Sequence, residues 1–90
     1  MIYAVIYQLA NVNEYYYTGL FKKIKDYSAW MHYIDNLWII SSTKNAEEIT
    51  NDLLILIDEE TDHIFVMKVT RDYFGWLPEE AWVWMKERTF

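Results

Sequence analysis

His32 is the side chain best suited to acid–base chemistry, because a phenol and a carboxylate lie close to it in the sequence. It lies next to the phenol of Tyr33 and three positions before the carboxylate of Asp35. A histidine titrates near neutral pH, and with an acid and a phenol nearby it can cleave RNA without a metal. The same pattern is more typical of a histidine whose hydrogen bonds are satisfied within a strand.

A charged pair follows the last predicted strand. Arg71 and Asp72 at a sheet end can contact a phosphate or a partner, which makes Asp72 a further catalytic candidate. A salt bridge at the sheet rim explains the pair more simply, and exposed salt bridges contribute little stability. His63, beside Asp62, is expected to be an exposed turn residue.

Three other clusters offer ligand chemistry but have simpler explanations. The acidic turn at residues 58–62 lacks the ligand spacing and the glycine of a calcium loop, so we expect it to be solvated. The three lysines within residues 22–25 are expected on a solvated helix face. The tyrosines at residues 15–17 can stack on bases, although packing against the helix start is favoured.

Composition narrows the class of protein. The chain has 90 residues, which suits a single domain over residues 1–90, and a net charge of −6, which disfavours binding to nucleic acid. It contains no cysteine, which favours a cytoplasmic location and leaves histidines and carboxylates as the only metal ligands. No apolar run approaches the ~20 residues of a membrane-spanning helix, so we expect no membrane association. The sequence has no Gly-rich phosphate loop and no zinc-ligand spacing, so we expect no cofactor.

Hydrophobic periodicity predicts a strand and then a helix at the start of the chain. Residues 1–9 are apolar at odd and even positions, which is typical of a central strand buried on both faces. Asn13 can cap an amphipathic helix whose apolar face comprises Tyr17, Leu20, Phe21, Ile24 and Tyr27. Gly19 indicates either a late helix start or the close approach of another backbone.

The middle of the chain predicts a hairpin and a second helix. Residues 30–34 and 37–42 are strand-prone, and Asp35 and Asn36 between them tolerate the positive φ of a two-residue hairpin turn. Asn45 and Glu48 then resemble a capping box. The helix that follows would present Ala46, Ile49, Leu53, Leu56 and Ile57 on one face and end at the acidic turn.

The remaining residues predict a fourth strand and an appended helix. Residues 64–69 alternate, with Phe65, Met67 and Val69 facing one side. Pro78 then starts a short helix with acidic residues in its first turn and basic residues in its last. The order of elements predicts an α+β fold, a ferredoxin-like βαββαβ sandwich with an appended C-terminal helix.

Large aromatic residues are unusually dense. The sequence has five Trp, eight Tyr and four Phe, and Trp76, Trp82 and Trp84 surround the last predicted helix. We expect these side chains to be buried, either within the domain or in a contact with a second copy or a partner. Both earlier helices cover one sheet face, so the other face needs a layer from the appended helix or a twin subunit. A homodimer is the economical arrangement, because two-fold symmetry lets a patch cover itself.

Three segments carry a resemblance to a known family. They are YQL at residues 7–9, WMHYIDNLWII at residues 30–40 and GWLPEEAW at residues 75–82. In these the chain resembles the SinR-family small proteins, which are similar in fold to the CRISPR-associated ferredoxin-like nuclease subunit and to VapD-type toxins. The resemblance implies a homodimeric βαββαβ domain linked to nucleic acid in mobile elements or defence systems.

Gln8 departs from the pattern of the CRISPR-associated relatives. In them an aspartate at this strand end enters the dimer cleft, where two copies can hold a divalent metal for phosphodiester hydrolysis. A neutral amide is a poorer ligand for a hard cation and cannot act as a general base. Metal-assisted hydrolysis is therefore disfavoured at this position.

Two functions remain open. The favoured one is a catalytically silent, dimeric interaction module that binds itself and a further protein partner. Its dimer or partner contacts are expected at Gln8, Arg71, Trp76 and Trp82. The alternative is an endoribonuclease-like nuclease acting on RNA or DNA, with Mg²⁺ or without a metal. Its catalytic candidates are His32, Asp35 and Asp72.

Overall fold

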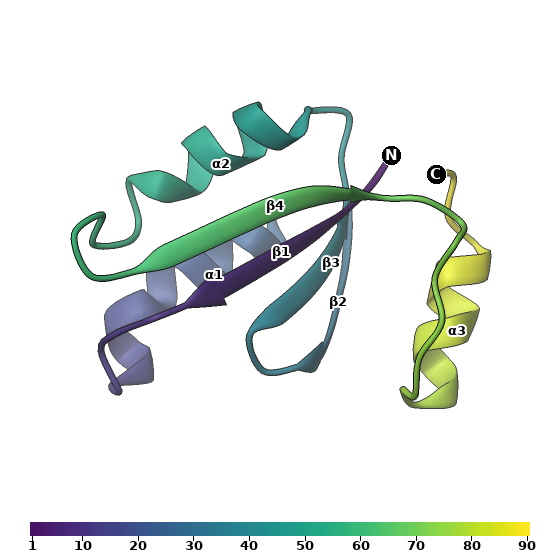
Figure 1. Ribbon diagram of the computed structural model, residues 1–90, viewed down its shortest axis with the longest axis horizontal. Helices are drawn as coiled ribbons and strands as arrows, with labels where there is room; N and C mark the ends of the chain where they lie inside the picture. Colours follow the sequence, from purple (N-terminus) through teal and green to yellow (C-terminus); the bar gives the residue numbers. More distant parts are fainter.

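The computed structural model describes residues 1–90 and contains a four-stranded antiparallel sheet with three α-helices (Figure 1). In chain order the elements are β1 (Ile2–Gln8), a 3₁₀ turn η1 (Glu14–Tyr17), α1 (Thr18–Lys25), β2 (Ala29–Ile34), β3 (Leu37–Ser41), α2 (Ala46–Leu54), β4 (His63–Val69) and α3 (Glu79–Lys86). The strands lie in the order β2-β3-β1-β4. The prediction of an α+β fold is confirmed, and the arrangement is compatible with a ferredoxin-like sandwich.

The strand β1 lies in the interior of the sheet and is buried on both faces. Val5 pairs with Trp38 of β3 and with Val66 of β4, so the strand has a neighbour along each edge. Its buried side chains alternate between two cores, with Tyr3, Val5 and Tyr7 in one and Ile2 and Ala4 in the other. The predicted central strand is confirmed, and its unbroken apolar run reflects burial on both sides.

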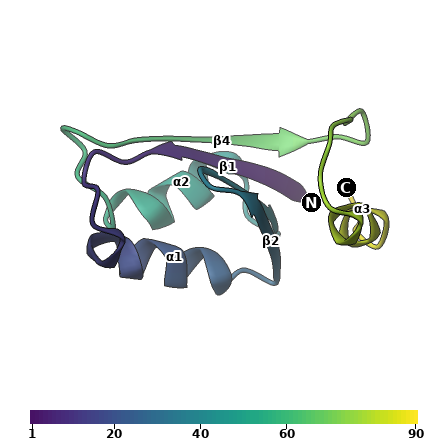
Figure 2. The ribbon, with the colours of Figure 1, turned by 90° about the horizontal axis from the view of Figure 1, so that it is seen from below.

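Helices α1 and α2 lie together on one face of the sheet (Figure 2). Leu20, Ile24, Ile49 and Leu53 are fully buried there against β1 and β3. The predicted capping box starts α2: Glu48 N–H donates to Asn45 Oδ1 at 2.9 Å, and Asn45 N–H donates to Glu48 Oε1 at 3.1 Å. The helix ends at Leu54, so the residues at 56–57 that we placed on it follow its end and pack against the core from there.

The first helical segment begins as a 3₁₀ turn. Asn13 caps this turn by accepting a hydrogen bond from Tyr15 N–H at 3.1 Å, and the α-helix starts only at Thr18. A Cβ atom at Gly19 would lie 3.4 Å from Leu56 Cδ2. The late helix start is therefore confirmed, and the group that approaches Gly19 is a side chain rather than a backbone.

The hairpin between β2 and β3 forms, but its turn differs from the prediction. Ile34 pairs with Leu37 across Asp35 and Asn36, yet no residue of the chain has a positive φ. A two-residue turn without positive φ fits the twist of the flanking strands poorly and splays them. The pairing accordingly shifts register between Met31 and Ile34, where the irregularity absorbs the mismatch.

The acidic turn before β4 is only partly solvated, because Asp62 is 3% exposed. Its carboxylate accepts hydrogen bonds from Ala10 N–H at 2.7 Å, Tyr17 OH at 3.0 Å and Asp58 N–H at 3.0 Å. Burial alone would raise the pKa of Asp62, but these donors outweigh burial and the pKa is lowered. The expectation of a solvated turn is wrong for this residue, which ties the loop after β1 to the loop after α2.

Helix α3 covers part of the second face, meaning the sheet face opposite to α1 and α2. Ala81 and Met85 are buried against a small core formed with Ile2, Ala4, Met31 and Ile39. Figure 2 shows α3 at the end of the sheet where β2 lies, with no element above β4. Phe65 and Met67 of β4 are accordingly 60% and 46% exposed, so the predicted second layer is incomplete in a single chain.

None of the helices combines the length and the apolar composition that a membrane span requires.

Met85→Ala is expected to lower the free energy of unfolding by about 2–4 kcal/mol, because it leaves a cavity between α3 and the sheet. Val83→Ala is the matched control: Val83 lies on the same helix, is 50% exposed, and should cost less than about 0.5–1 kcal/mol. Urea denaturation followed by far-UV circular dichroism measures both. Equal costs for the two variants would contradict the packing of α3 on this face.

Candidate functional site

Gln8 ends β1 and pairs with His63, the first residue of β4. Both side chains are exposed at the end of the uncovered part of the second face. His63 is thus the exposed residue expected from the sequence. A carboxamide opposite an imidazole offers two weak ligands for a hard cation, and no three His, Cys, Asp or Glu side chains gather to hold a metal anywhere in the chain.

His32 and Asp35 lie together at the hairpin, but through the backbone of Asp35. His32 Nε2 is 3.0 Å from the carbonyl oxygen of Asp35, and the imidazole stacks on the Trp38 indole with ring centroids 3.8 Å apart. Tyr7 OH donates to the same carbonyl at 2.8 Å. The Asp35 carboxylate takes no part in this cluster, so the imidazole has no carboxylate partner to orient it as a general base.

Trp38 and Tyr7 extend this cluster into the core. Trp38 Nε1–H donates to Tyr7 OH at 3.0 Å, which continues the chain of hydrogen bonds to the Asp35 carbonyl. Burial raises the pKa of Tyr7, against the lowering effect of the Trp38 hydrogen bond. The phenol therefore stays protonated and donates, and the cluster fixes the hairpin to β1.

Arg71 and Asp72 do not form the predicted salt bridge. The Arg71 guanidinium donates to the carbonyl oxygen of Arg88 at 2.9 Å and lies 4.6 Å from the centre of the Phe90 ring. Asp72 is exposed, and its backbone N–H donates to Thr70 Oγ1 at 3.3 Å. The two ion pairs of the chain are Lys44–Asp52 and Arg88–Glu87. Arg71 thus anchors the C-terminal residues, and Asp72 is left facing solvent.

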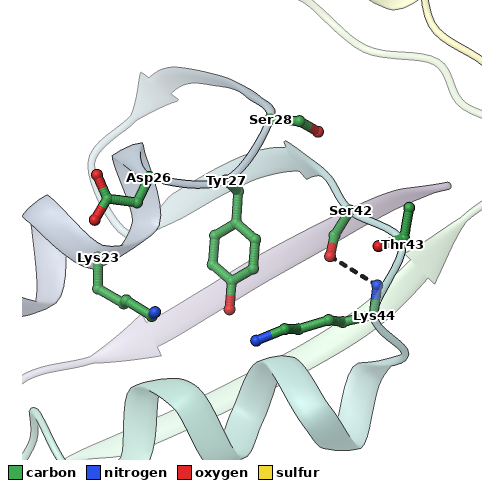
Figure 3. A pocket seen from close by; sticks show the side chains of 7 residues that line it. All are labelled: Lys23, Asp26, Tyr27, Ser28, Ser42, Thr43 and Lys44. Carbon is green, nitrogen blue, oxygen red and sulfur yellow. Dashed lines mark hydrogen bonds between the residues drawn. The ribbon is translucent and has the colours of Figure 1, made fainter.

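A polar pocket opens where the loop after α1 meets the loop after β3 (Figure 3). Its volume is about 280 Å³, and its lining comprises Lys23, Asp26, Tyr27, Ser28, Ser42, Thr43 and Lys44. Figure 3 shows the side chains of Lys23 and Lys44 approaching the Tyr27 hydroxyl from opposite sides. Two ammonium groups with several hydroxyls are a combination that suits an anion.

Asp52 of α2 is not part of the pocket lining but pairs with two residues that are, Lys44 and Tyr27. Lys44 Nζ lies 2.6 Å from Asp52 Oδ2, and Tyr27 OH donates to the same oxygen at 2.7 Å. The hydrogen bonds from Lys44 and then Tyr27 hold the pKa of Asp52 below its usual value, whereas burial and the Asp52 carboxylate raise the pKa of Tyr27. The arrangement balances the charge of Lys44 and ties the end of α1 to α2, so we assign it a structural role.

An apolar groove lies on the second face, between the β2–β3 hairpin and the segment that leads into α3. Its volume is about 230 Å³. Its lining comprises Met31, Tyr33, Ile34, Leu37, Ile39, Val69, Tyr73, Phe74, Gly75, Trp76, Leu77, Trp82 and Met85. None of these side chains is charged. Twelve of the thirteen lining residues are hydrophobic.

One wall of the groove is the aromatic strap, which we define as residues 73–77. Tyr73 stacks on Trp82 with ring centroids 6.2 Å apart, and a Cβ atom at Gly75 would lie 3.8 Å from the Trp82 ring. Phe74 and Trp76 point away from this support and are 103% and 98% exposed. Trp76 is therefore not buried within one chain, while Trp82 and Trp84 are half-buried.

No protein-family model and no curated protein matches the chain. The resemblance to the SinR family consequently stands on the three sequence segments alone.

Sequence reasoning missed the features that stand out most in the structure. The contact of Tyr27 with Asp52 joins residues 25 positions apart, and no local pattern connects them. The groove combines residues of β2, β3 and α3 with the strap, so it exists only once the fold has formed. One available signal was the run Tyr73-Phe74-Gly75-Trp76-Leu77, which is too apolar for an exposed loop and therefore indicates a contact.

Asp52→Asn is expected to lower the free energy of unfolding by about 1 kcal/mol at pH 7, because it removes the charge from two partly exposed hydrogen bonds. The folded-state pKa of Asp52 is lowered, so its contribution is complete above the unfolded value of about 3.9. That contribution is lost as the pH falls through the lower folded value. Urea denaturation at pH 7 and at about pH 2.5 should show the difference from the wild type shrinking.

Asp26→Asn provides the matched control for this pH dependence. Asp26 lines the same pocket but is exposed, and its carboxylate makes no hydrogen bond. We expect a change below about 0.5 kcal/mol at either pH. A difference between Asp52→Asn and wild type that persists unchanged in acid would contradict the assignment.

Proposed function

We propose that this protein is a small homodimeric interaction module without catalytic activity, and that its second face forms the interface. The observation that carries the proposal is the incomplete cover of this face. Phe65 and Met67 of β4 are 60% and 46% exposed, and Phe74 and Trp76, which line the groove, are 103% and 98% exposed. No residue that lines the groove is charged. Exposed apolar surface of this extent marks a site of protein association.

The fold assignment that we propose is the ferredoxin-like βαββαβ sandwich with α3 appended. It is supported by the strand order β2-β3-β1-β4, by antiparallel pairing throughout, and by the joint packing of α1 and α2 on one face. Ferredoxin-like domains leave their second face free, and here α3 covers only the part near β2. A place in mobile elements or defence systems follows from the resemblance to the SinR family.

The nuclease alternative finds less support among the side chains that would have to perform it. Gln8 lies opposite His63 without a carboxylate, and His32 directs Nε2 at a backbone carbonyl rather than at an acid. Asp72 lies in the segment that leaves β4, and it has no hydrogen-bonded histidine or base beside it. The net charge of −6 further opposes approach to a phosphate backbone.

Sedimentation equilibrium at micromolar concentration is expected to give twice the 11.0 kDa mass of one chain. Raising the salt from about 20 mM to about 0.5 M should strengthen the dimer, because screening reduces the repulsion between two acidic chains while the apolar contact persists. A species of 11.0 kDa at these concentrations would refute the proposed homodimer.

Incubation of the wild type with labelled RNA or DNA and Mg²⁺ or Mn²⁺ is expected to give no cleavage above background, because no cation site with a carboxylate ligand exists at the end of β1. Gln8→Asp supplies that ligand opposite His63, and isothermal titration with Mn²⁺ shows whether it creates a cation site.

His32→Phe is the informative partner variant, because phenylalanine can keep the stacking on Trp38 and lacks the ring nitrogens. We expect it to behave as the wild type does. Robust wild-type cleavage that His32→Phe abolishes would establish the nuclease function instead.

A further inference from the structure

We propose that the aromatic strap is the element through which two copies join: Phe74 and Trp76 of each copy enter the apolar groove of the other. The inference rests on the proposed homodimer and names the residues that form it. Phe65 and Met67 of β4, which α3 leaves uncovered, offer a rival surface, so the two statements can fail separately.

The backbone that carries the two exposed aromatics of the strap is supported on both sides. Tyr73 and Leu77 are half-buried on either side of them and pack against the small core beneath α3. Tyr73 stacks on Trp82 of α3 with the two rings 3° from parallel, and this contact holds the strap against the helix. Phe74 and Trp76 are therefore presented to solvent by a supported backbone, which lowers the entropy that a partner contact must overcome.

The groove beside the strap suits an aromatic side chain. Its volume is about 230 Å³, and a neighbouring hollow of about 710 Å³ shares residues 73–77 and Trp82 with it. The walls of the groove carry no charged group and few polar ones, so nothing in it would orient a polar metabolite. Aromatic side chains that fill an uncharged pocket are, by contrast, the usual anchors of protein interfaces.

A second copy of this chain is the occupant that the geometry favours. The strap forms one wall of the groove, so the inserting side chains and the receiving hollow adjoin on the same surface. A two-fold axis next to the strap brings each strap against the hairpin of the other copy, which is the isologous contact of a C2 dimer. Because each chain carries a charge of −6, a contact between copies must have an uncharged centre, and the groove provides one.

The area available extends to what a stable dimer needs. A large aromatic side chain buries about 150–250 Å², so Phe74 and Trp76 from both copies together bury about 800 Å². The surface that covers them adds at most a similar area, so the contact buries between about 800 and 1,600 Å² in total. The upper end of this range is the size of a standard protein–protein interface.

Sedimentation velocity over a concentration series compares the wild type with Phe74→Ser/Trp76→Ser and with Val12→Ser/Tyr15→Ser. The control pair is also strongly exposed, at 98% and 88%, and it lies in and just after the loop that follows β1, at the opposite end of the molecule from α3 (Figure 1). We expect the strap variant to dimerise at least about 30-fold more weakly than the wild type and the control pair to dimerise like it.

Each result bears on the two proposals differently. A strap variant that dimerises within about threefold of the wild type overturns the reciprocal insertion and leaves the homodimer in place. A wild type that remains monomeric overturns both. Circular dichroism of the strap variant should match that of the wild type, because neither substituted side chain is buried within the chain.

Cross-linking tests the insertion in the chain with its strap aromatics intact. The protein has no cysteine, so Gly75→Cys and Ile34→Cys can each carry a single thiol on opposite walls of the groove. Mixing the two variants, one of them tagged, with a short bis-maleimide should join tagged to untagged chains. Val12→Cys in place of Gly75→Cys should not cross-link to Ile34→Cys. Equal cross-linking of both pairs, or of neither, overturns the proposed docking.

Discussion

The burial of β1 on both faces is the constraint from which the rest of the architecture follows. Val5 faces the core beneath α1 and α2, while Ile2 and Ala4 face the opposite side and are equally hidden from water. A sheet with one helical layer would leave the second set exposed, so a further element has to cover it. Helix α3 covers Ile2 and Ala4 but stops short of Phe65 and Met67, and this shortfall is the physical origin of the proposed interface.

Polar side chains that are buried or half-buried hold the layers in place. Asp62 joins two loops, Asp52 joins the end of α1 to α2, and Tyr7 joins the core to the hairpin backbone. No buried side-chain nitrogen or oxygen is left without a hydrogen-bond partner. These hydrogen-bonded groups favour one arrangement of the small fold over others, because burying any of them without a partner would cost free energy. The surface left for function is then chiefly apolar.

The sequence predicted what depends on local patterns. The capping box of Asn45 and Glu48 and the alternation along β4 fix their elements through neighbours a few residues away, and both appear in the structure. The backbone of the Asp35–Asn36 turn could not be predicted, since the register shift that accommodates it belongs to the whole hairpin. The burial of Asp62 was equally hidden, because its donors at Ala10 and Tyr17 lie some fifty residues away. For the site, composition indicated excess apolar surface, but which strap residues face outward depends on how Trp82 supports Tyr73.

The pairing of β1 with β4 also has a consequence for synthesis on the ribosome. Ile2 pairs with Val69, and the seven residue pairs between the two strands join the beginning of the chain to a segment made much later. Until residues 63–69 have left the exit tunnel, one edge of β1 has no partner, and its apolar side chains lack their full cover. The sheet of the nascent chain is therefore completed only when β4 emerges, and the second face of β1 is covered later still, when α3 follows.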